Sequence, residues 1–228
     1  MSSIRLLAVG DISLQTRNNQ LPFANIKDAL GEKDILFGKL ETALTGREAA
    51  VEKSVALTGH PGRIAHMKEA GFDIVNVANN HIMDAGIDGF NQTLDTLAEQ
   101  NLPFVGGINP VHPKADVILE HDSIRLGFLG YYTYGTTYCD GEVIINSVDE
   151  DTIVADMNRI SNECDHIIVS LHWGIEKAFY PSPEQIGLAH SLIDNGASVI
   201  LGHHPHVVQA VEEYGGGVIA FSLGNFQF

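Results

Sequence analysis

The chain has 228 residues, of which 44% are hydrophobic and 18% are charged, and this globular composition excludes an intrinsically disordered protein. The 13 basic and 29 acidic residues give a formal net charge of −16 at pH 7. This charge argues against nucleic acid and anionic membranes as partners, because clustered Lys and Arg bind both. No secretory pattern opens the chain, and no run approaches the ~20 apolar residues that span a bilayer. We therefore expect one domain over residues 1–228 with no direct membrane insertion, cytoplasmic unless an upstream anchor or a partner attaches it to a membrane.

Short apolar runs rich in Val, Ile and Leu alternate with helix-like patterns, and such runs are typical of strands buried on both faces. The expected strands are, in chain order, 4–9, 34–37, 73–78, 125–129, 166–171, 197–201 and 218–223. The expected helices are 61–70, 88–100, 149–161 and 183–195. The alternation predicts an α/β fold with much parallel pairing. A predicted hairpin over 115–129 makes the sheets mixed.

Six of the expected strands end in a short turn with a side chain suited to metal binding or acid–base chemistry. In α/β folds this edge of the sheet is where ligands bind. The turns contain, in chain order, Asp11, Lys39 and Glu41, Asn80 and His81, His172 and Glu176, the run of His203, His204 and His206, and Asn225. Six such turns in one chain indicate one composite site.

The residues in these turns predict a metal centre with mixed nitrogen and oxygen ligands. The expected ligands are Asp11, Glu41, Asn80, His172, His204 and His206. No Cys lies near them, which disfavours a thiolate zinc finger and favours Mn, Fe, Zn or Mg. A carboxylate that bridges two metals would hold and acidify a water molecule. His81, beside Asn80, is then free to act as an acid or to stabilise charge.

Several motifs of other enzyme classes are missing from the sequence. It contains no G-x-x-x-x-G-K-[ST] phosphate loop, no G-x-G-x-x-G and no G-x-S-x-G elbow. Their absence argues against nucleoside-triphosphate motor chemistry, dinucleotide hydride transfer and the α/β-hydrolase route.

Together the motifs resemble the CapA family of bacterial capsule or poly-γ-glutamate biosynthesis proteins, in order and over nearly the whole chain. They are AVGD at 8–11, LET at 40–42, ANNH at 78–81, HWGIE at 172–176, GHHPHV at 202–207 and SLGNF at 222–226. That family is in turn similar to calcineurin-like metallophosphoesterases. The resemblance implies a four-layer α/β/β/α sandwich with metals at the strand ends. It also implies that Glu41 replaces a bridging aspartate and that His81 is the catalytic histidine.

The chain departs from the phosphoesterase pattern in ways that bear on the metal count. Ser13 stands where phosphoesterases carry a histidine, so one metal site loses an imidazole, and we expect one or two divalent ions per chain. Lys39 stands where the capsule family usually carries Asn, and it either neutralises Glu41 or binds an anionic substrate. The family usually continues past Asn225, so a C-terminal extension of this domain can be missing.

Two further residues of these turns are site candidates. We place Glu176 with His81 among the catalytic residues, although it can either orient His172 or lie in solvent. We place His203 and Lys39 among the substrate-binding residues. Because His203 directly precedes the pair of His204 and His206, it is also an alternative metal ligand in place of one of them.

These residues lead to one main functional hypothesis and two alternatives. The first is a metal-dependent, metallophosphatase-like hydrolase that acts on an anionic phosphoester or a γ-glutamyl substrate. The net charge opposes a polyanion unless the metal and nearby lysines such as Lys39 and Lys53 reverse the sign locally. The second is a non-catalytic subunit that binds capsule polymer or its synthase and export machinery. The third is an amide hydrolase that uses Glu41 with Asp11 and no metal.

Overall fold

The computed structural model describes residues 3–15, 22–23, 25–26, 28–133 and 143–228. The elements are, in chain order, β1 (Leu6–Ile12), β2 (Ile35–Leu40), β3 (Ala43–Leu44), β4 (Thr58–Gly59), η1 (Pro61–Arg63), α1 (Ile64–Ala70), β5 (Ile74–Asn76), α2 (Gly86–Glu99), β6 (Phe104–Val105), β7 (Gly107–Ile108), β8 (Asp116–His121), β9 (Ile124–Tyr132), β10 (Ile144–Ile145), α3 (Glu150–Ile160), β11 (His166–His172), α4 (Pro183–Asp194), β12 (Val199–His203), β13 (Val211–Tyr214), β14 (Gly217–Ala220) and β15 (Asn225–Gln227).

Two sheets carry most of the strands. The first has the order β15-β1-β2-β5-β6, with every neighbouring pair parallel. The second has the order β13-β14-β12-β11-β9-β8, parallel in its centre and antiparallel at the β13–β14 and β8–β9 edges. Two short pairs, β10-β7 and β3-β4, lie outside these sheets. The second sheet is therefore mixed, as predicted from the hairpin, whereas the first is entirely parallel.

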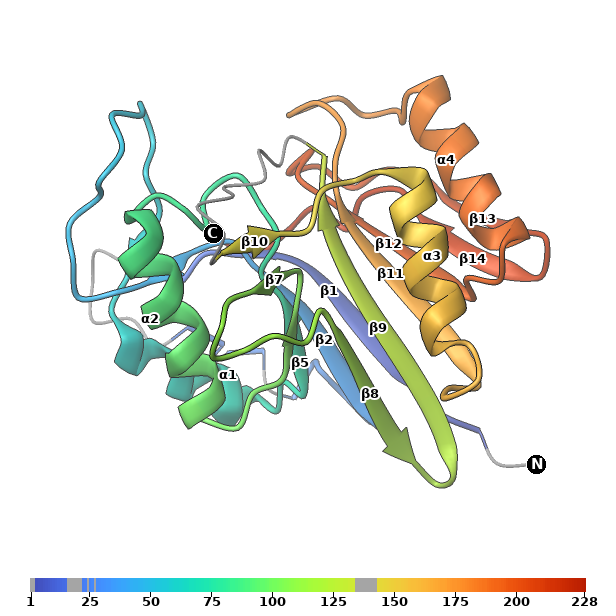
Figure 1. Ribbon diagram of the computed structural model, residues 1–228, viewed down its shortest axis with the longest axis horizontal. Coiled ribbons are helices and arrows are strands. Elements are labelled where there is room, and N and C mark those ends of the chain that lie inside the picture. The colour runs from blue at the N-terminus through green and yellow to red at the C-terminus, as the bar shows by residue number, and fades with distance from the viewer. Residues whose placement is uncertain (1–2, 16–21, 24, 27, 134–142) are drawn as a thin grey trace.

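Helices cover the outer faces of the two sheets, with α1 and α2 on one side and α3 and α4 on the other (Figure 1). A separate apolar layer lies between the sheets, where the rings of Phe37 and Phe128 stack at 6.0 Å. The other two cores pack α1 and α2 against the first sheet and α3 and α4 against the second. This is the expected four-layer α/β/β/α sandwich, and it buries both faces of each sheet.

The strands agree with the sequence prediction in position but differ at the ends that matter for the site. β1 continues through Asp11, which was expected to follow its strand. The continuation is possible because Asp11 N donates to the Gly224 carbonyl at 2.8 Å. Gly10 permits this close approach, since a Cβ at that position would lie 1.8 Å from the same oxygen. The strand expected at 218–223 is β14, which ends at Ala220, and a further strand that was not expected, β15, follows it in the other sheet.

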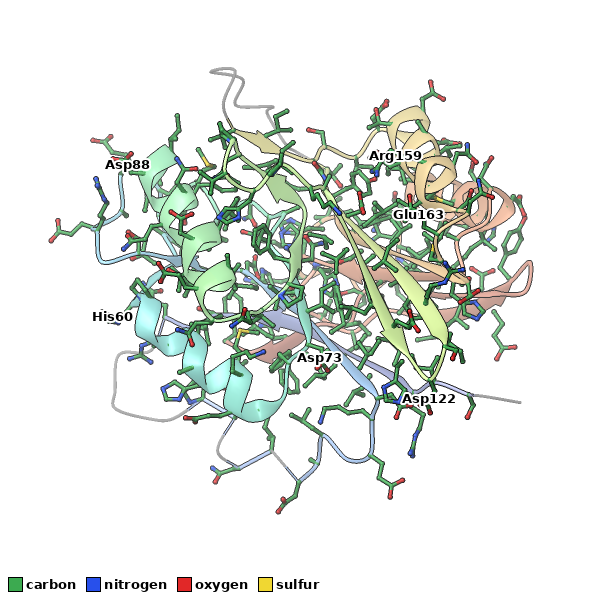
Figure 2. The ribbon with its side chains drawn as sticks, turned by 60° about the horizontal axis from the view of Figure 1, so that its bottom comes forward. His60, Asp73, Asp88, Asp122, Arg159 and Glu163 are labelled. Carbon is green, nitrogen blue, oxygen red and sulfur yellow. The ribbon has the colours of Figure 1, made fainter. Side chains whose placement is uncertain are left out.

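Much of the acidic charge lies on the outside of the sandwich. Figure 2 shows Asp88 of α2, Asp122 of the β8–β9 turn and Glu163 after α3 at the periphery, and all three are exposed. Among the described residues, no helix has both the length and the apolar character that crossing a bilayer requires.

Candidate metal centre

The two sheets bring their C-terminal strand ends together, and this position unites the predicted ligands. Asp11 and Glu41 come from the ends of β1 and β2, and Asn80 follows β5. His172 ends β11 and is in register with His203 at the end of β12. Residues that are as many as 195 positions apart, such as Asp11 and His206, thus become neighbours, as parallel strands of two packed sheets allow.

Two fully buried carboxylates form the centre of the cluster. Asp11 Oδ2 accepts a hydrogen bond from His204 N at 3.1 Å and lies 3.5 Å from His206 Nδ1. Glu41 Oε1 lies 3.7 Å from His172 Nε2 and 3.8 Å from His206 Nε2. The carboxylates therefore face the imidazoles, although most of these separations exceed a hydrogen bond.

Burial makes the charged forms of these groups costly. It raises the pKa of Glu41 to about 9, with further upward pressure from Asp11. It raises the pKa of Asp11 to about 6, against the opposing effect of His206. It lowers the pKa of His172 well below the ordinary value, and nearby Lys39 adds to that effect. Without a bound cation, burial thus favours a neutral Glu41 carboxyl and a neutral His172 imidazole.

Asn80, His172 and His204 complete one group of candidate ligands around Glu41. Asn80 Oδ1 lies 2.9 Å from His172 Nε2, and the rings of His172 and His204 are 4.7 Å apart. A ligand bond of about 2.0–2.2 Å places adjacent ligand atoms roughly 3–3.5 Å apart. The 2.9 Å between Asn80 Oδ1 and His172 Nε2 and the 3.7 Å between Glu41 Oε1 and His172 Nε2 lie within a few tenths of an ångström of this range.

The loop that carries the final histidine pair is strained. His204 and His206 have φ angles of +95° and +58°, a region that residues other than glycine rarely adopt. His206 Nδ1 lies 2.7 Å from Asn225 Oδ1, which orients its other nitrogen toward Glu41. Strain of this kind persists where the surrounding structure holds a functional geometry.

The donor set fits a divalent metal ion. Among the described residues, buried atoms without a hydrogen-bond partner include Asp11 Oδ1, both carboxylate oxygens of Glu41 and Nδ1 of His172. Such orphaned groups cost free energy unless something pairs with them. Three groups of possible ligand atoms each lie within 4.8 Å: Glu41, His172 and His204; Asp11, Glu41 and His206; and Glu176, His204 and His206.

His81 lies beside this cluster with two partners that fix it. Its Nδ1 is 2.7 Å from Asp84 Oδ2, and Asp84 Oδ1 accepts from Lys53 Nζ at 2.6 Å. Burial alone would raise the pKa of Asp84, but the hydrogen bonds from His81 and Lys53 hold it below its ordinary value. The Asn79 side chain shapes the turn, since its amide donates to Leu40 O and its oxygen accepts from His81 N.

The structure places the remaining sequence candidates at different depths. Lys39 and His203 are fully buried, so their surroundings do not favour the substrate contact that was expected of them. His203 Nδ1 lies 3.6 Å from Asp11 Oδ1, behind the cluster. Glu176 is exposed, with its carboxylate near His204 and His206. Burial lowers the pKa of Lys39 to about 7, against the opposing effects of Glu41 and Asp11.

Comparison with known proteins agrees with this arrangement. Residues 5–228 match the family described as bacterial capsule synthesis protein PGA_cap. The chain belongs to this family. It is 31% identical over 218 residues to the capsule biosynthesis protein CapA of Bacillus anthracis, and 30% identical over 213 residues to the PGA biosynthesis protein CapA of Bacillus subtilis. Each match covers 90% of the chain but only 53% and 56% of those relatives, so the chain spans about half their length.

Solved structures of lower sequence identity show the same fold. A phosphatase from Mycoplasma pneumoniae superposes with a TM-score of 0.61 at 16% identity, covering 98% of this chain and 73% of that one. A calcineurin-like phosphoesterase from Bacillus subtilis gives a TM-score of 0.61 at 18% identity, covering 93% of this chain and 75% of that one. The fold is therefore that of the calcineurin-like phosphoesterases.

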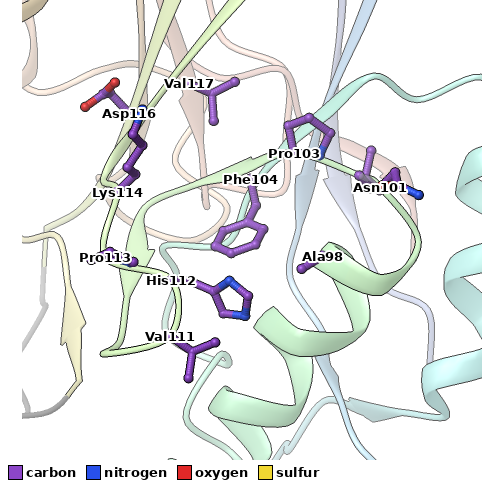
Figure 3. Close-up of a pocket in the computed structure, with 11 residues that line it drawn as sticks. Ala98, Asn101, Pro103, Phe104, Val111, His112, Pro113, Lys114, Asp116 and Val117 are labelled. Atoms are coloured by element: carbon purple, nitrogen blue, oxygen red, sulfur yellow. The ribbon is translucent and has the colours of Figure 1, made fainter.

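A separate cavity of about 470 Å³ lies outside the strand-end cluster of this PGA_cap protein. Figure 3 shows Phe104, His112 and Val117 on its walls, between the end of α2 and the approach to β8. None of its lining residues is a candidate ligand. It is mostly apolar, and His112 there is paired with Asp95 at 2.9 Å.

Sequence reasoning assigned no role to Asp84, and it placed Asn225 among the strand-end side chains without naming a partner for it. Asp84 is three residues after His81, and this spacing in a turn was the available signal for a side-chain pair. Nothing in the spacing of His206 and Asn225 could have revealed their contact, because β15 approaches the loop only through the pairing of β15 with β1.

Proposed function

We propose that this chain is a metal-dependent hydrolase that acts on an anionic phosphoester or a γ-glutamyl substrate. The observation that carries the proposal is the pair of buried carboxylates, Asp11 and Glu41. Their oxygens without a hydrogen-bond partner lie 3.6–3.8 Å from imidazole nitrogens of His203, His172 and His206. Such a set has little use in stabilising a fold, because each orphaned group costs free energy. It suits a divalent ion such as Mn, Fe or Zn.

A bound divalent ion supplies Lewis acidity toward a water molecule and a substrate oxygen. The chain's own residues would then orient the reaction. Glu41, Asn80, His172 and His204 would form one ligand set, and Asp11, Glu41 and His206 a second. The Asp84 carboxylate would accept a hydrogen bond from Nδ1 of His81. With both ring nitrogens protonated, His81 would then deliver its Nε2 proton to the leaving group and keep the Nδ1 proton.

The proposed substrates are suggested by two observations, the fold of the chain and the names of its relatives. Phosphoester chemistry is suggested by the structural neighbours, which include a phosphatase. A γ-glutamyl polymer is suggested by the name of the Bacillus subtilis relative, a PGA biosynthesis protein. The net charge of −16 repels such polyanions at a distance. Lys53, whose ammonium group lies 2.6 Å from Asp84 beside His81, would offset this locally.

The deciding experiment compares metal content and turnover in the same samples. Protein is loaded with Mn, dialysed and analysed by mass spectrometry beside an Asn80→Ala/His206→Ala variant. We expect the wild type to retain metal and to hydrolyse a member of a phosphoester and γ-glutamyl panel, and the variant to do neither. An exposed substitution, Asp88→Asn, serves as the matched control. Metal-free wild type after loading would contradict the proposal.

One observation favours a second candidate, a non-catalytic subunit that binds capsule polymer or synthase components. Ser13 replaces an expected imidazole, and its hydroxyl instead accepts from Gln15 N and Thr42 Oγ1 at 3.3 Å. If the chain is a polymer-binding subunit, the wild type and His81→Ala should bind poly-γ-glutamate with equal affinity, and neither should show turnover. Turnover that survives exhaustive chelation would instead point to the metal-free route through Glu41 and Asp11.

A further inference from the structure

The second group of candidate ligands, Asp11, Glu41 and His206, is the smaller of the two. It offers three side chains and shares Glu41 with the first group, which Asn80 enlarges to four. A divalent transition metal in a mixed nitrogen and oxygen site usually takes at least four ligands. Water can fill a position, but a further protein donor holds the ion more tightly. The side chains around His206 therefore decide whether this group binds an ion of its own.

The hydroxyl groups that follow β1 and β2 in the chain are already engaged. Ser13 Oγ accepts hydrogen bonds from Gln15 N and from Thr42 Oγ1, each at 3.3 Å. Thr42 Oγ1 itself accepts from Leu14 N at 2.8 Å. These contacts join the two strand ends to each other, and they leave the fourth ligand to come from elsewhere.

Glu176 offers a donor on the exposed side of this group. One oxygen of its carboxylate lies within 4.8 Å of ring nitrogens of both His204 and His206. This limit is longer than the roughly 3–3.5 Å between adjacent ligand atoms of one ion, so the carboxylate moves inward when an ion binds. Glu176 is exposed, and an exposed glutamate side chain keeps the rotamer freedom that such a movement needs.

The backbone holds Glu176 beside the two histidines. Its turn follows β11, and the histidine loop follows the neighbouring strand β12 (Figure 1). Trp173 N donates to the His203 carbonyl at 3.1 Å, and Lys177 N donates to the Pro205 carbonyl at 2.8 Å. The turn is therefore attached to the histidine loop on both sides of Glu176. The backbone fixes the position of this residue, and only its side chain has to adjust.

The fold itself makes little use of the Glu176 carboxylate. Trp173, in the same turn, is buried and donates from Nε1 to the Phe221 carbonyl at 2.9 Å, so it stabilises the turn. Within the described part of the chain, the Glu176 side chain forms neither a hydrogen bond nor a close ion pair. Its carboxylate is thus available to a ligand.

We propose that Glu176 is a metal ligand that adds a fourth protein donor to Asp11, Glu41 and His206, so that this group binds a second divalent ion. The inference rests on the proposed metal dependence and adds the second ion and the residue that completes its site. The first ion occupies the other ligand set. The role of Glu176 is then to hold an ion, in place of the catalytic role that the sequence suggested.

The test counts bound ions in two neutral variants that differ in their capacity to ligate. Wild type, Glu176→Gln and Glu176→His are titrated with Mn near neutral pH, counted by mass spectrometry and examined by electron paramagnetic resonance. We expect two ions and the spectrum of a coupled Mn pair in wild type. Glu176→Gln should show one uncoupled ion, or bind the second at least about tenfold more weakly, since losing even a partner of a ligand costs 10–100-fold in metal affinity.

Two comparisons show whether ligation is the cause. Glu176→His is as neutral as Glu176→Gln but supplies a ring nitrogen, so it should keep the second ion. Glu163→Gln, exposed after α3, removes a carboxylate far along the chain from the cluster and should match the wild type. Circular dichroism checks that every variant is folded, as expected for substitutions of exposed side chains.

The outcomes distinguish this inference from the proposed function. The role of Glu176 is overturned, with metal dependence intact, if wild type binds a single ion or if Glu176→Gln binds two with unchanged affinity. Equal weakening in Glu176→Gln and Glu176→His also overturns it, because the lost charge rather than the lost ligand would then be the cause. Wild type that binds no more metal than Asn80→Ala/His206→Ala overturns the metal dependence itself.

Discussion

His81 Nδ1 lies 2.7 Å from Asp84 Oδ2, within a turn that also binds Lys53 through the other oxygen of the same carboxylate. This contact fixes both the tautomer and the direction of the His81 ring. The nitrogen that remains, Nε2, is the one available to a substrate. The sequence places His81 beside Asn80, but the ring has a defined orientation toward a substrate only because Asp84 holds it.

Removing the His81 proton donor should cost activity without unfolding the protein. We expect His81→Ala to lower turnover about 10²-fold or more, since general acid catalysis contributes typically 10²–10⁴-fold. Asp84→Asn should lower turnover by a smaller factor, because the ring loses its anionic partner but the amide can still accept from Leu57 N. Steady-state kinetics and thermal melting of both variants test this. Asp88→Asn, exposed on α2, should match the wild type.

Removal of the bound metal should destabilise the protein, and the size of the loss should depend on the ligand side chains. Mn at about a hundred times its dissociation constant should stabilise the wild type by about 2.7 kcal/mol relative to chelated protein. His172→Ala should lose most of this gain because it removes a buried ligand. The measurement is the melting temperature with and without chelator. An equal Mn-induced shift in the variant would show that the metal binds elsewhere.

The burial of Glu41 makes a prediction about pH in the metal-free state. Its pKa is about 9 when folded and about 4.5 when unfolded, so between these values the folded state binds more protons and stability falls as pH rises. Glu41→Gln removes this effect. The stability of chelated wild type relative to Glu41→Gln should therefore fall by about 2 kcal/mol from pH 5 to pH 7. Urea denaturation at several pH values measures the difference, and a constant difference would contradict the burial of a titrating Glu41.

The contact between the sheets below the site should be important for stability. Asn76 donates to Ser170 Oγ at 2.8 Å and accepts from Ala78 N at 2.8 Å, all in buried surroundings. Asn76→Ala leaves these partners unsatisfied and should cost about 1–3 kcal/mol of unfolding free energy. Ser170→Ala should cost less, since the Asn76 amide still reaches the Ser170 carbonyl. Denaturant midpoints of the two variants test this prediction, and the midpoint of Asn76→Ala should be the lower of the two.

Local patterns in the sequence predicted the main buried strands, the four helices and the kinds of side chain at the strand ends. The buried strands were visible because continuous Val, Ile and Leu runs have few alternatives to a doubly covered sheet. The helix at 183–195 was visible from its boundary residues, and the structure adds a capping box at Ser182 and Gln185. The ligand types Asp11, Glu41 and His172 stood out because polar side chains at parallel strand ends meet at one edge.

The long-range contacts could not be predicted from the sequence. Pairing of β15 with β1 brings Asn225 to His206, and packing of the two sheets brings Glu41 to His172. The complete burial of Lys39 and His203 has the same origin. As polar residues they were expected to contact substrate, but only the second sheet, laid over the first, removes them from water.

The sequence by itself determined the α/β class, the order of the elements and the kinds of side chain available at the strand ends, because each of these depends on residues close along the chain. Only the tertiary structure decided which side chains face one another, which are excluded from water, and therefore which carboxylates and which lysine carry shifted pKa values. The physical reason is that burial and electrostatic coupling depend on distance in space. In this protein the deciding distances join residues as much as 195 positions apart.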